Sequence, residues 1–166
     1  MTKPKANGFT LIEILVVSSL AIILMLAASA LFMTFMISNT KINIDQKIKN
    51  EGNYALRQIE YLLRNSQEIT STCPGTQNDI SFTDLDGQTT TIKADSGKIA
   101  SESSSTVYLT SDYSVLVDDP QFACYLGTND TQYIEVSFSL KNRGGGSESS
   151  SDTSVQDFNT GITVRN

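Results

Sequence analysis

The chain has 166 residues, enough for one modest domain with an added segment, and a net charge of −6. Residues 71–166 hold 13 of the 18 acidic residues and 5 of the 12 basic ones. Tight binding of this part to nucleic acid or anionic lipid is not expected, because both need clustered lysine and arginine. With no histidine, phosphate loop or nucleophile motif, we expect no enzymatic activity, cofactor or metal.

The N-terminal part indicates a membrane segment. Residues 1–8 carry Lys3 and Lys5, and residues 11–37 form an apolar run of 27 residues with a single charge, at Glu13. As a helix this run spans ~40 Å, against ~30 Å of bilayer hydrocarbon. Because cations stay on the cytoplasmic side, the pattern predicts that residues 1–8 stay in the cytoplasm, that the apolar half-helix, residues 9–37, spans the membrane, and that the rest lies outside.

Two simpler interpretations of the apolar run lead to a different function. Ala28-Ser29-Ala30 resembles a signal peptidase site, but the apolar run continues past it, whereas the apolar part of a signal peptide is ~7–15 residues long. A plain single-pass anchor leaves Glu13 unexplained, because a carboxylate costs about 2.5–3.5 kcal/mol at the bilayer centre. Either interpretation would make the chain a secreted or membrane-anchored extracytoplasmic binding domain.

A third interpretation explains Glu13. Gly8-Phe9-Thr10-Leu11-Ile12-Glu13, followed by an unbroken apolar run, resembles the processing and methylation site of type IV pilins and pseudopilins. The resemblance implies cleavage between Gly8 and Phe9 by a prepilin peptidase, N-methylation of Phe9, and pairing of Glu13 with the amino terminus of a neighbouring subunit. An amine and a carboxylate attract strongly in a low dielectric, so Glu13 would set the axial register of docking.

The next segment, residues 38–66, is predicted to continue the helix with an amphipathic pattern. One face carries apolar residues at helical spacing: Ile44, Ile48, Ala55, Ile59 and Leu62. Gly52 weakens the middle of this segment and is a candidate bend. We therefore expect one helix from about residue 9 to about residue 66, with its C-terminal half packed on a sheet.

Residues 67–166 have the pattern of an antiparallel sheet. Apolar alternation predicts strands at residues 79–83, 89–93, 107–110, 133–140 and 161–164. Asp86-Gly87 indicates a hairpin turn between the first two. A serine-rich segment, residues 101–105, and a Gly/Ser-rich segment, residues 144–154, are expected to be loops. The fold class is thus α+β, the pilin-like architecture of one long helix followed by a sheet.

The chain has two cysteines, Cys73 and Cys124. In an exported chain an even pair indicates a disulfide, and no spacing of a zinc or redox site is present. Such a bond would close a loop of about 50 residues, worth about 3–4 kcal/mol in the chain-entropy model.

The C-terminal residues 158–166, with Asn53-Tyr54-Ala55-Leu56 in the helix, are similar to those of PilW-type minor pilins and J-type pseudopilins. The resemblance implies a structural subunit of a type IV pilus, a type II secretion pseudopilus or a competence filament. Its implied partners are the prepilin peptidase and methyltransferase, other major and minor pilins, a membrane platform protein, an assembly ATPase and membrane lipid. Its implied location is the cytoplasmic membrane and then a cell-surface or periplasmic filament.

Overall fold

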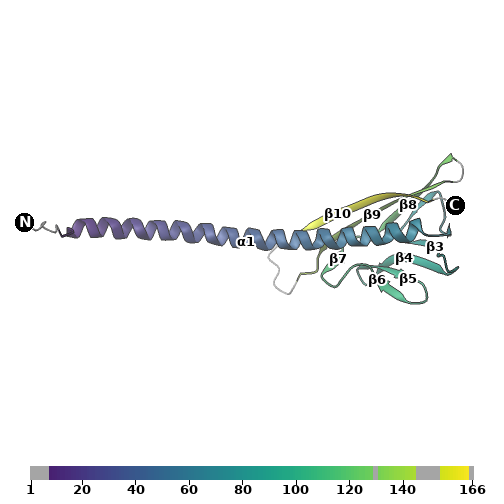
Figure 1. Cartoon of the computed structure of the whole chain (residues 1–166), viewed down its shortest axis with the longest axis horizontal. Coiled ribbons are helices and arrows are strands. Elements are labelled where there is room, and N and C mark those ends of the chain that lie inside the picture. The colour runs from purple at the N-terminus through teal and green to yellow at the C-terminus, as the bar shows by residue number, and fades with distance from the viewer. Residues whose placement is uncertain (1–7, 129–130, 145–153, 165–166) are drawn as a thin grey trace, which may run out of the picture. The chain divides into compact units, whose positions relative to one another are not determined.

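The structure, a computed structural model, describes residues 8–128, 131–144 and 154–164. One long helix, α1 (Leu11–Arg64), is followed by ten strands that pair only antiparallel among the described residues (Figure 1). The predicted α+β class is therefore confirmed. The chain divides into two compact units, unit 1 with residues 1–42 and unit 2 with residues 43–166. Residues 1–7 of the predicted leader and residues 145–153 of the predicted Gly/Ser-rich loop lie outside the described residues.

Helix α1 is slightly shorter than the predicted range of 9–66, because side chains cap both of its ends. At its start, the backbone N–H of Glu13 donates to the Thr10 hydroxyl at 3.4 Å. At its end, the Asn65 amide donates to the Tyr61 carbonyl and the Ser66 hydroxyl to the Leu63 carbonyl, both at 2.8 Å. These bonds satisfy backbone groups that lack a partner within the helix, so the helical pattern stops there.

The strands of unit 2 form two sheets (Figure 1). The first sheet has the order β1-β3-β4-β5-β6, and its strands are β1 (Glu68–Ile69), β3 (Ile80–Thr83), β4 (Thr89–Asp95), β5 (Lys98–Glu102) and β6 (Thr106–Tyr108). The second sheet has the order β10-β9-β8-β2, and β7 also pairs with β9. Its strands are β10 (Val155–Val164), β9 (Gln132–Asn142), β8 (Gln121–Leu126), β2 (Gly75–Gln77) and β7 (Ser114–Leu116).

The five predicted strands correspond to β3, β4, β6, β9 and β10. The predicted hairpin turn between β3 and β4 is present: Gly87 has a φ of 74°, and its N–H donates to the Asp84 carbonyl at 2.9 Å. Several strand boundaries differ by one or two residues, and β10 differs by more. The predicted loop at residues 101–105 is shorter, because β5 extends to Glu102, and β10 begins at Val155, six residues before the predicted strand.

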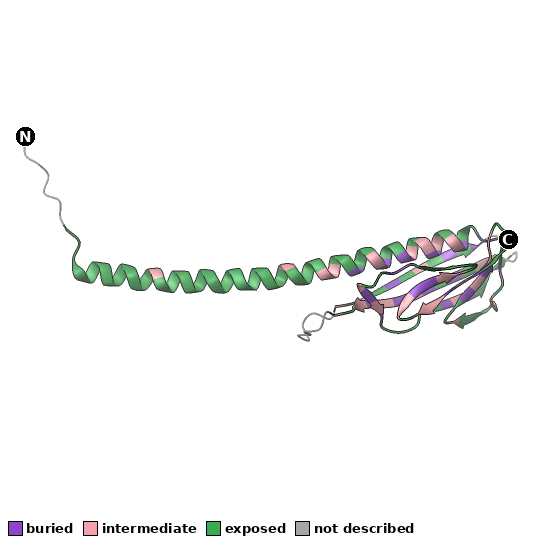
Figure 2. Cartoon of the chain, turned by 90° about the horizontal axis from the view of Figure 1, so that it is seen from below, coloured by how far each residue is buried: buried purple, intermediate pink, exposed green. Residues whose placement is uncertain are grey.

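One hydrophobic core joins the helix to both sheets of unit 2. Its helical members are Ile48, Ala55, Ile59 and Leu63, all with no exposed surface. Leu62, predicted for this face, is partly buried at its margin, while Leu63, which the prediction omitted, takes the central place. Figure 2 shows the buried residues on this part of α1 and along the strands. The predicted packing of an amphipathic half-helix on a sheet is thus present, over two sheets.

The predicted disulfide between Cys73 and Cys124 is present, with an S–S distance of 2.01 Å. It lies beside the pairing of β2 with β8, in which Gly75 is opposite Cys124. β2 has only three residues, none of them buried. The covalent bond therefore holds a strand that contributes little apolar burial of its own.

Candidate functional site at the start of the helix

The first turn of α1 is closed by a reciprocal pair of side chains, Thr10 and Glu13. The Thr10 N–H and the Thr10 hydroxyl both donate to Glu13 Oε2 at 3.2 Å, while the Glu13 N–H donates to the Thr10 hydroxyl oxygen at 3.4 Å. This is a capping box, in which Thr10 is the N-cap residue and Glu13 is the third residue of the helix. It also places the carboxylate at the positive end of the helix dipole.

The capping box was missed in the sequence, although its signal is there. Thr10-Leu11-Ile12-Glu13 fits the pattern of serine or threonine followed three residues later by glutamate or glutamine, directly before an apolar run. The structure therefore gives the Glu13 carboxylate hydrogen-bond donors within its own chain. Those donors are neutral, so they supply hydrogen bonds without cancelling the charge.

Most other hydroxyl side chains of unit 1 are satisfied within the helix. Five hydroxyls donate to backbone carbonyls three or four residues earlier, at 2.8–3.1 Å: those of Ser18, Ser19, Ser29, Thr34 and Thr40. Within the described part of unit 1, Glu13 is the one charged group of the apolar run. It is therefore the polar group whose charge still requires a counter-charge in an apolar surrounding.

The large apolar side chains of this run are mostly exposed. Leu11, Leu24 and Leu31, for example, expose 79%, 69% and 73% of their surface. By length and composition α1 can cross a bilayer. A continuous apolar surface of this extent is not stable in water and calls for lipid or other apolar helices around it.

The predicted processing residues lie next to this cap. Gly8, Phe9 and Thr10 precede the helix, and Phe9 exposes 80% of its surface. Phe9 and Glu13 line one shallow groove of about 310 Å³, together with Ile14, Val17, Ser18 and Ala21. The structure thus places the predicted new N-terminal residue and the carboxylate on one side of the helix, above a surface of small and apolar side chains.

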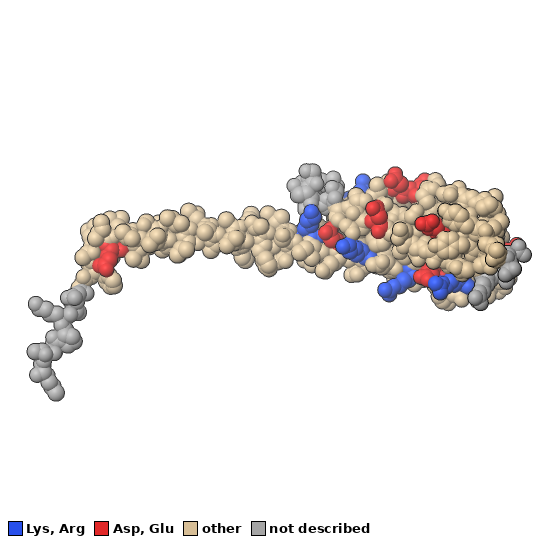
Figure 3. Space-filling view, turned by 90° about the horizontal axis from the view of Figure 1, so that it is seen from above, with Lys and Arg blue, Asp and Glu red and all other residues tan. Residues whose placement is uncertain are grey.

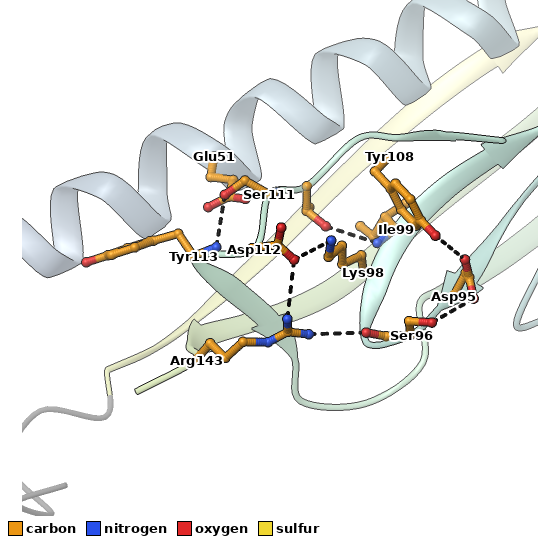
Figure 4. Close-up of polar contacts among 11 residues, drawn as sticks. Glu51, Asp95, Ser96, Lys98, Ile99, Tyr108, Ser111, Asp112, Tyr113 and Arg143 are labelled. Atoms are coloured by element: carbon orange, nitrogen blue, oxygen red, sulfur yellow. Dashed lines mark hydrogen bonds and ion pairs between the residues drawn. The ribbon is translucent and has the colours of Figure 1, made fainter. Parts of the chain in front are cut away.

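A second group of charged side chains lies in unit 2 and joins its two sheets (Figure 4). Asp112 forms ion pairs with Lys98 of the first sheet at 2.5 Å and with Arg143, just after β9 of the second sheet, at 3.4 Å. The hydrogen bond and charge of Lys98, with the charge of Arg143, hold the pKa of Asp112 below its usual value. Because each charge has a counter-charge, the group links the elements that carry it. We call Lys98, Asp112 and Arg143 the clasp.

The same clasp continues along the first sheet. The Tyr108 hydroxyl donates to Asp95 Oδ2 at 2.7 Å, which lowers the pKa of Asp95 and raises that of Tyr108. The Lys98 ammonium also lies over the Tyr108 ring, 4.6 Å from its centroid. Nothing among the described residues forms a cluster of three or more histidine, cysteine or acidic side chains suited to a metal ion.

Comparison with known proteins supports the interpretation of the N-terminal segment. Residues 3–29 match a family model described as the prokaryotic N-terminal methylation motif. No curated protein and no solved structure is significantly similar to the chain. The matched segment contains Gly8, Phe9, the capping box and residues 11–29 of the apolar run. The chain thus combines this methylation motif with a long helix followed by antiparallel sheets.

Proposed function

We propose that the protein is a minor pilin or pseudopilin, a non-enzymatic structural subunit of a type IV pilus, a type II secretion pseudopilus or a competence filament. The observation that carries the proposal is the methylation motif at residues 3–29, joined without interruption to an exposed apolar helix. Such a helix can be held first by lipid and then by the helices of other subunits, since both offer an apolar surrounding.

The proposal includes an organisation of the chain. Residues 1–8 are the leader, residues 9–37 the membrane and filament-core half of the helix, residues 38–66 its amphipathic half, and residues 67–166 the globular domain outside. A prepilin peptidase cuts between Gly8 and Phe9 and Phe9 is methylated. The partners are membrane lipid, other pilins and the platform protein of the assembly machine. The location is the cytoplasmic membrane and then a filament.

The N-terminus of the mature protein tests the processing step. Mass spectrometry of the protein from filaments or membranes should find a chain that begins with N-methylated Phe9. The exposed position of Gly8 and Phe9 ahead of the capped helix makes this peptide bond accessible to a peptidase. A chain that begins at Leu31 would instead support cleavage by signal peptidase and a secreted binding domain.

The structure allows a sharper test of Glu13 than simple removal. Glutamine also serves as the third residue of a capping box, so Glu13→Gln keeps the hydrogen bonds with Thr10 and removes the charge. We expect Glu13→Gln to insert in the membrane as the wild type does and to be strongly depleted from sheared filaments. Ser18→Ala, which changes the same groove without changing charge, is the control. Normal incorporation of Glu13→Gln would show that the charge does not direct assembly.

A further inference from the structure

The outer side of α1 in unit 2 carries a basic and aromatic stripe. Six exposed residues recur at spacings of three and four, so they share one helix face: Lys47, Asn50, Tyr54, Arg57, Tyr61 and Arg64. We call this face the outer stripe. Tyr54 and Tyr61 expose 56% and 64% of their surface. Arg57 forms no ion pair with any described residue. Tyrosine and arginine are among the residues most enriched at the energetic centres of protein interfaces.

The outer face of the second sheet is acidic. Asp118, Asp119, Glu135 and Asp157 are all exposed. Three of them, Asp118, Asp119 and Asp157, line a groove of about 370 Å³ over β8, β9 and β10. We call it the acidic groove. The Ser139 hydroxyl donates to Asp157 at 2.7 Å and the Asn78 amide to Asp119 at 3.4 Å. No basic side chain among the described residues pairs with these carboxylates.

The two surfaces lie on different elements of one unit and have opposite charge. Figure 3 shows most of the basic side chains in a row along α1 and acidic ones over the sheet beside it. An arginine fork can bond a carboxylate through two parallel hydrogen bonds. Complementary charge on facing surfaces guides encounter and fixes the register of binding.

We infer that the outer stripe of one subunit docks in the acidic groove of a second copy of this chain. The inference rests on the proposed function, because it describes how neighbouring subunits of a filament would meet. A contact between two different patches of the same chain is heterologous, and repeated heterologous contacts build open helical assemblies. Arg57 would lie between Asp119 and Asp157, and Tyr54 and Tyr61 would cover the groove beside it.

Charge exchange in the full chain tests this contact. Lys47→Glu with Arg57→Glu reverses the outer stripe, and Asp119→Lys with Asp157→Lys reverses the acidic groove. Each pair should lower the amount of the protein in sheared filaments by about tenfold, because like charges then face each other. All four substitutions in one chain should restore incorporation, since every contact between copies would again join opposite charges.

The matched control reverses a pair inside one subunit. Lys93 and Glu102 form an ion pair on the first sheet, and Lys93→Glu with Glu102→Lys should incorporate normally. Formation of the Cys73–Cys124 bond and membrane level report folding of each variant. Unchanged incorporation of both reversed pairs would overturn the contact. If the fourfold variant is incorporated into filaments no better than either double variant, the partner in the acidic groove is not a second copy of this chain. Absence of the wild type from filaments would instead refute the proposed function.

Discussion

Gly52 lies on the buried side of α1, where a missing side chain leaves room for the ring of Phe158. A Cβ atom built on Gly52 would overlap three ring carbons of Phe158. That ring is stacked on Phe138 of the neighbouring strand, with centroids 5.3 Å apart. From the sequence alone, Gly52 was expected to weaken the middle of the helix and to be a candidate bend. In the structure it is a position where the α1 backbone packs directly against the Phe158 ring of β10.

Gly52→Ala should therefore destabilise unit 2, although alanine favours a helix by about 1 kcal/mol over glycine. Overpacking costs about 1–3 kcal/mol, and the Phe158 ring has little room to move because it is stacked on Phe138. We expect a net loss of about 1 kcal/mol, measured by denaturant unfolding of the full chain in detergent with near-UV circular dichroism.

The matched control is Asn53→Ala, an exposed neighbour on the same helix, which should leave stability almost unchanged. Phe158→Leu in the Gly52→Ala background should recover part of the loss caused by the overlap, because a smaller side chain leaves room for the methyl group. If the Gly52→Ala protein is as stable as the wild type, the Phe158 ring can move aside without a loss of folding free energy.

At the scale of elements, the clasp around Asp112 connects segments that are distant in the chain. It joins the β4–β5 hairpin, the segment after β6 and the end of β9, since Arg143 also donates to the Ser96 carbonyl at 3.2 Å. Lys98 is largely covered, with 14% of its side chain exposed, whereas Asp112 exposes 82%. Solvent screens the exposed carboxylate, so the clasp positions elements more than it adds stability.

We expect the ion pairs of Asp112 to make a contribution to folding stability that is lost in acid. The pKa of Asp112 is lower in the folded state than its ordinary value of 3.8. Its contribution is therefore complete above about pH 4 and is lost as the pH falls through the lower folded value. Asp112→Asn should reduce the decline in unfolding midpoint below pH 4, measured on the full chain in detergent.

Lys98→Gln is the companion variant, because Lys98 is the main cause of the lowered pKa of Asp112. It should also reduce the decline in unfolding midpoint below pH 4, although the Asp112 carboxylate is still present. Equal acid sensitivity of the wild type and both variants would show that the folded and unfolded states bind the Asp112 proton equally.

The elements that the sequence revealed are those whose alternation is clear. In β9, Ile134, Val136, Phe138 and Leu140 are buried between less buried residues, and the strand was predicted almost to its ends. β8 was missed because Ala123 and Tyr125 place apolar and aromatic residues on its outer side as well, which hides the period of two. β1, β2 and β7 have only two or three residues, too few for any period to be recognised.

Among the functional and charged residues, too, some could be identified from the sequence and others could not. Gly8, Phe9 and Glu13 could be selected from the sequence because their order and spacing are specific. The clasp of Lys98, Asp112 and Arg143 could not, because it depends on a tertiary arrangement that brings two sheets together. The acidic groove likewise combines β8 and β10 with the turn before β8. Charge composition alone indicated only that this half of the chain is acidic.

At the scale of the whole molecule, the core lies entirely within residues 43–166. Its first buried member is Ile48, and Ile44 packs against its margin. Unit 2 also includes the disulfide and the clasp. The C-terminal part of α1 is therefore as necessary to the globular unit as any strand, because it supplies the apolar stripe on which both sheets pack.

A fragment of residues 43–166 should consequently fold in water, form the Cys73–Cys124 bond and unfold cooperatively in urea. A fragment of residues 53–166 should be far less stable, because it lacks Ile48, which has no exposed surface. Ile48→Ala in the longer fragment should cost about 2–5 kcal/mol, the range for removing a buried isoleucine side chain. Gln46→Ala, an exposed neighbour, should cost almost nothing. The idea that α1 belongs to the core of unit 2 would fail if both fragments had the same urea midpoint, or if residues 43–166 showed no cooperative transition at all.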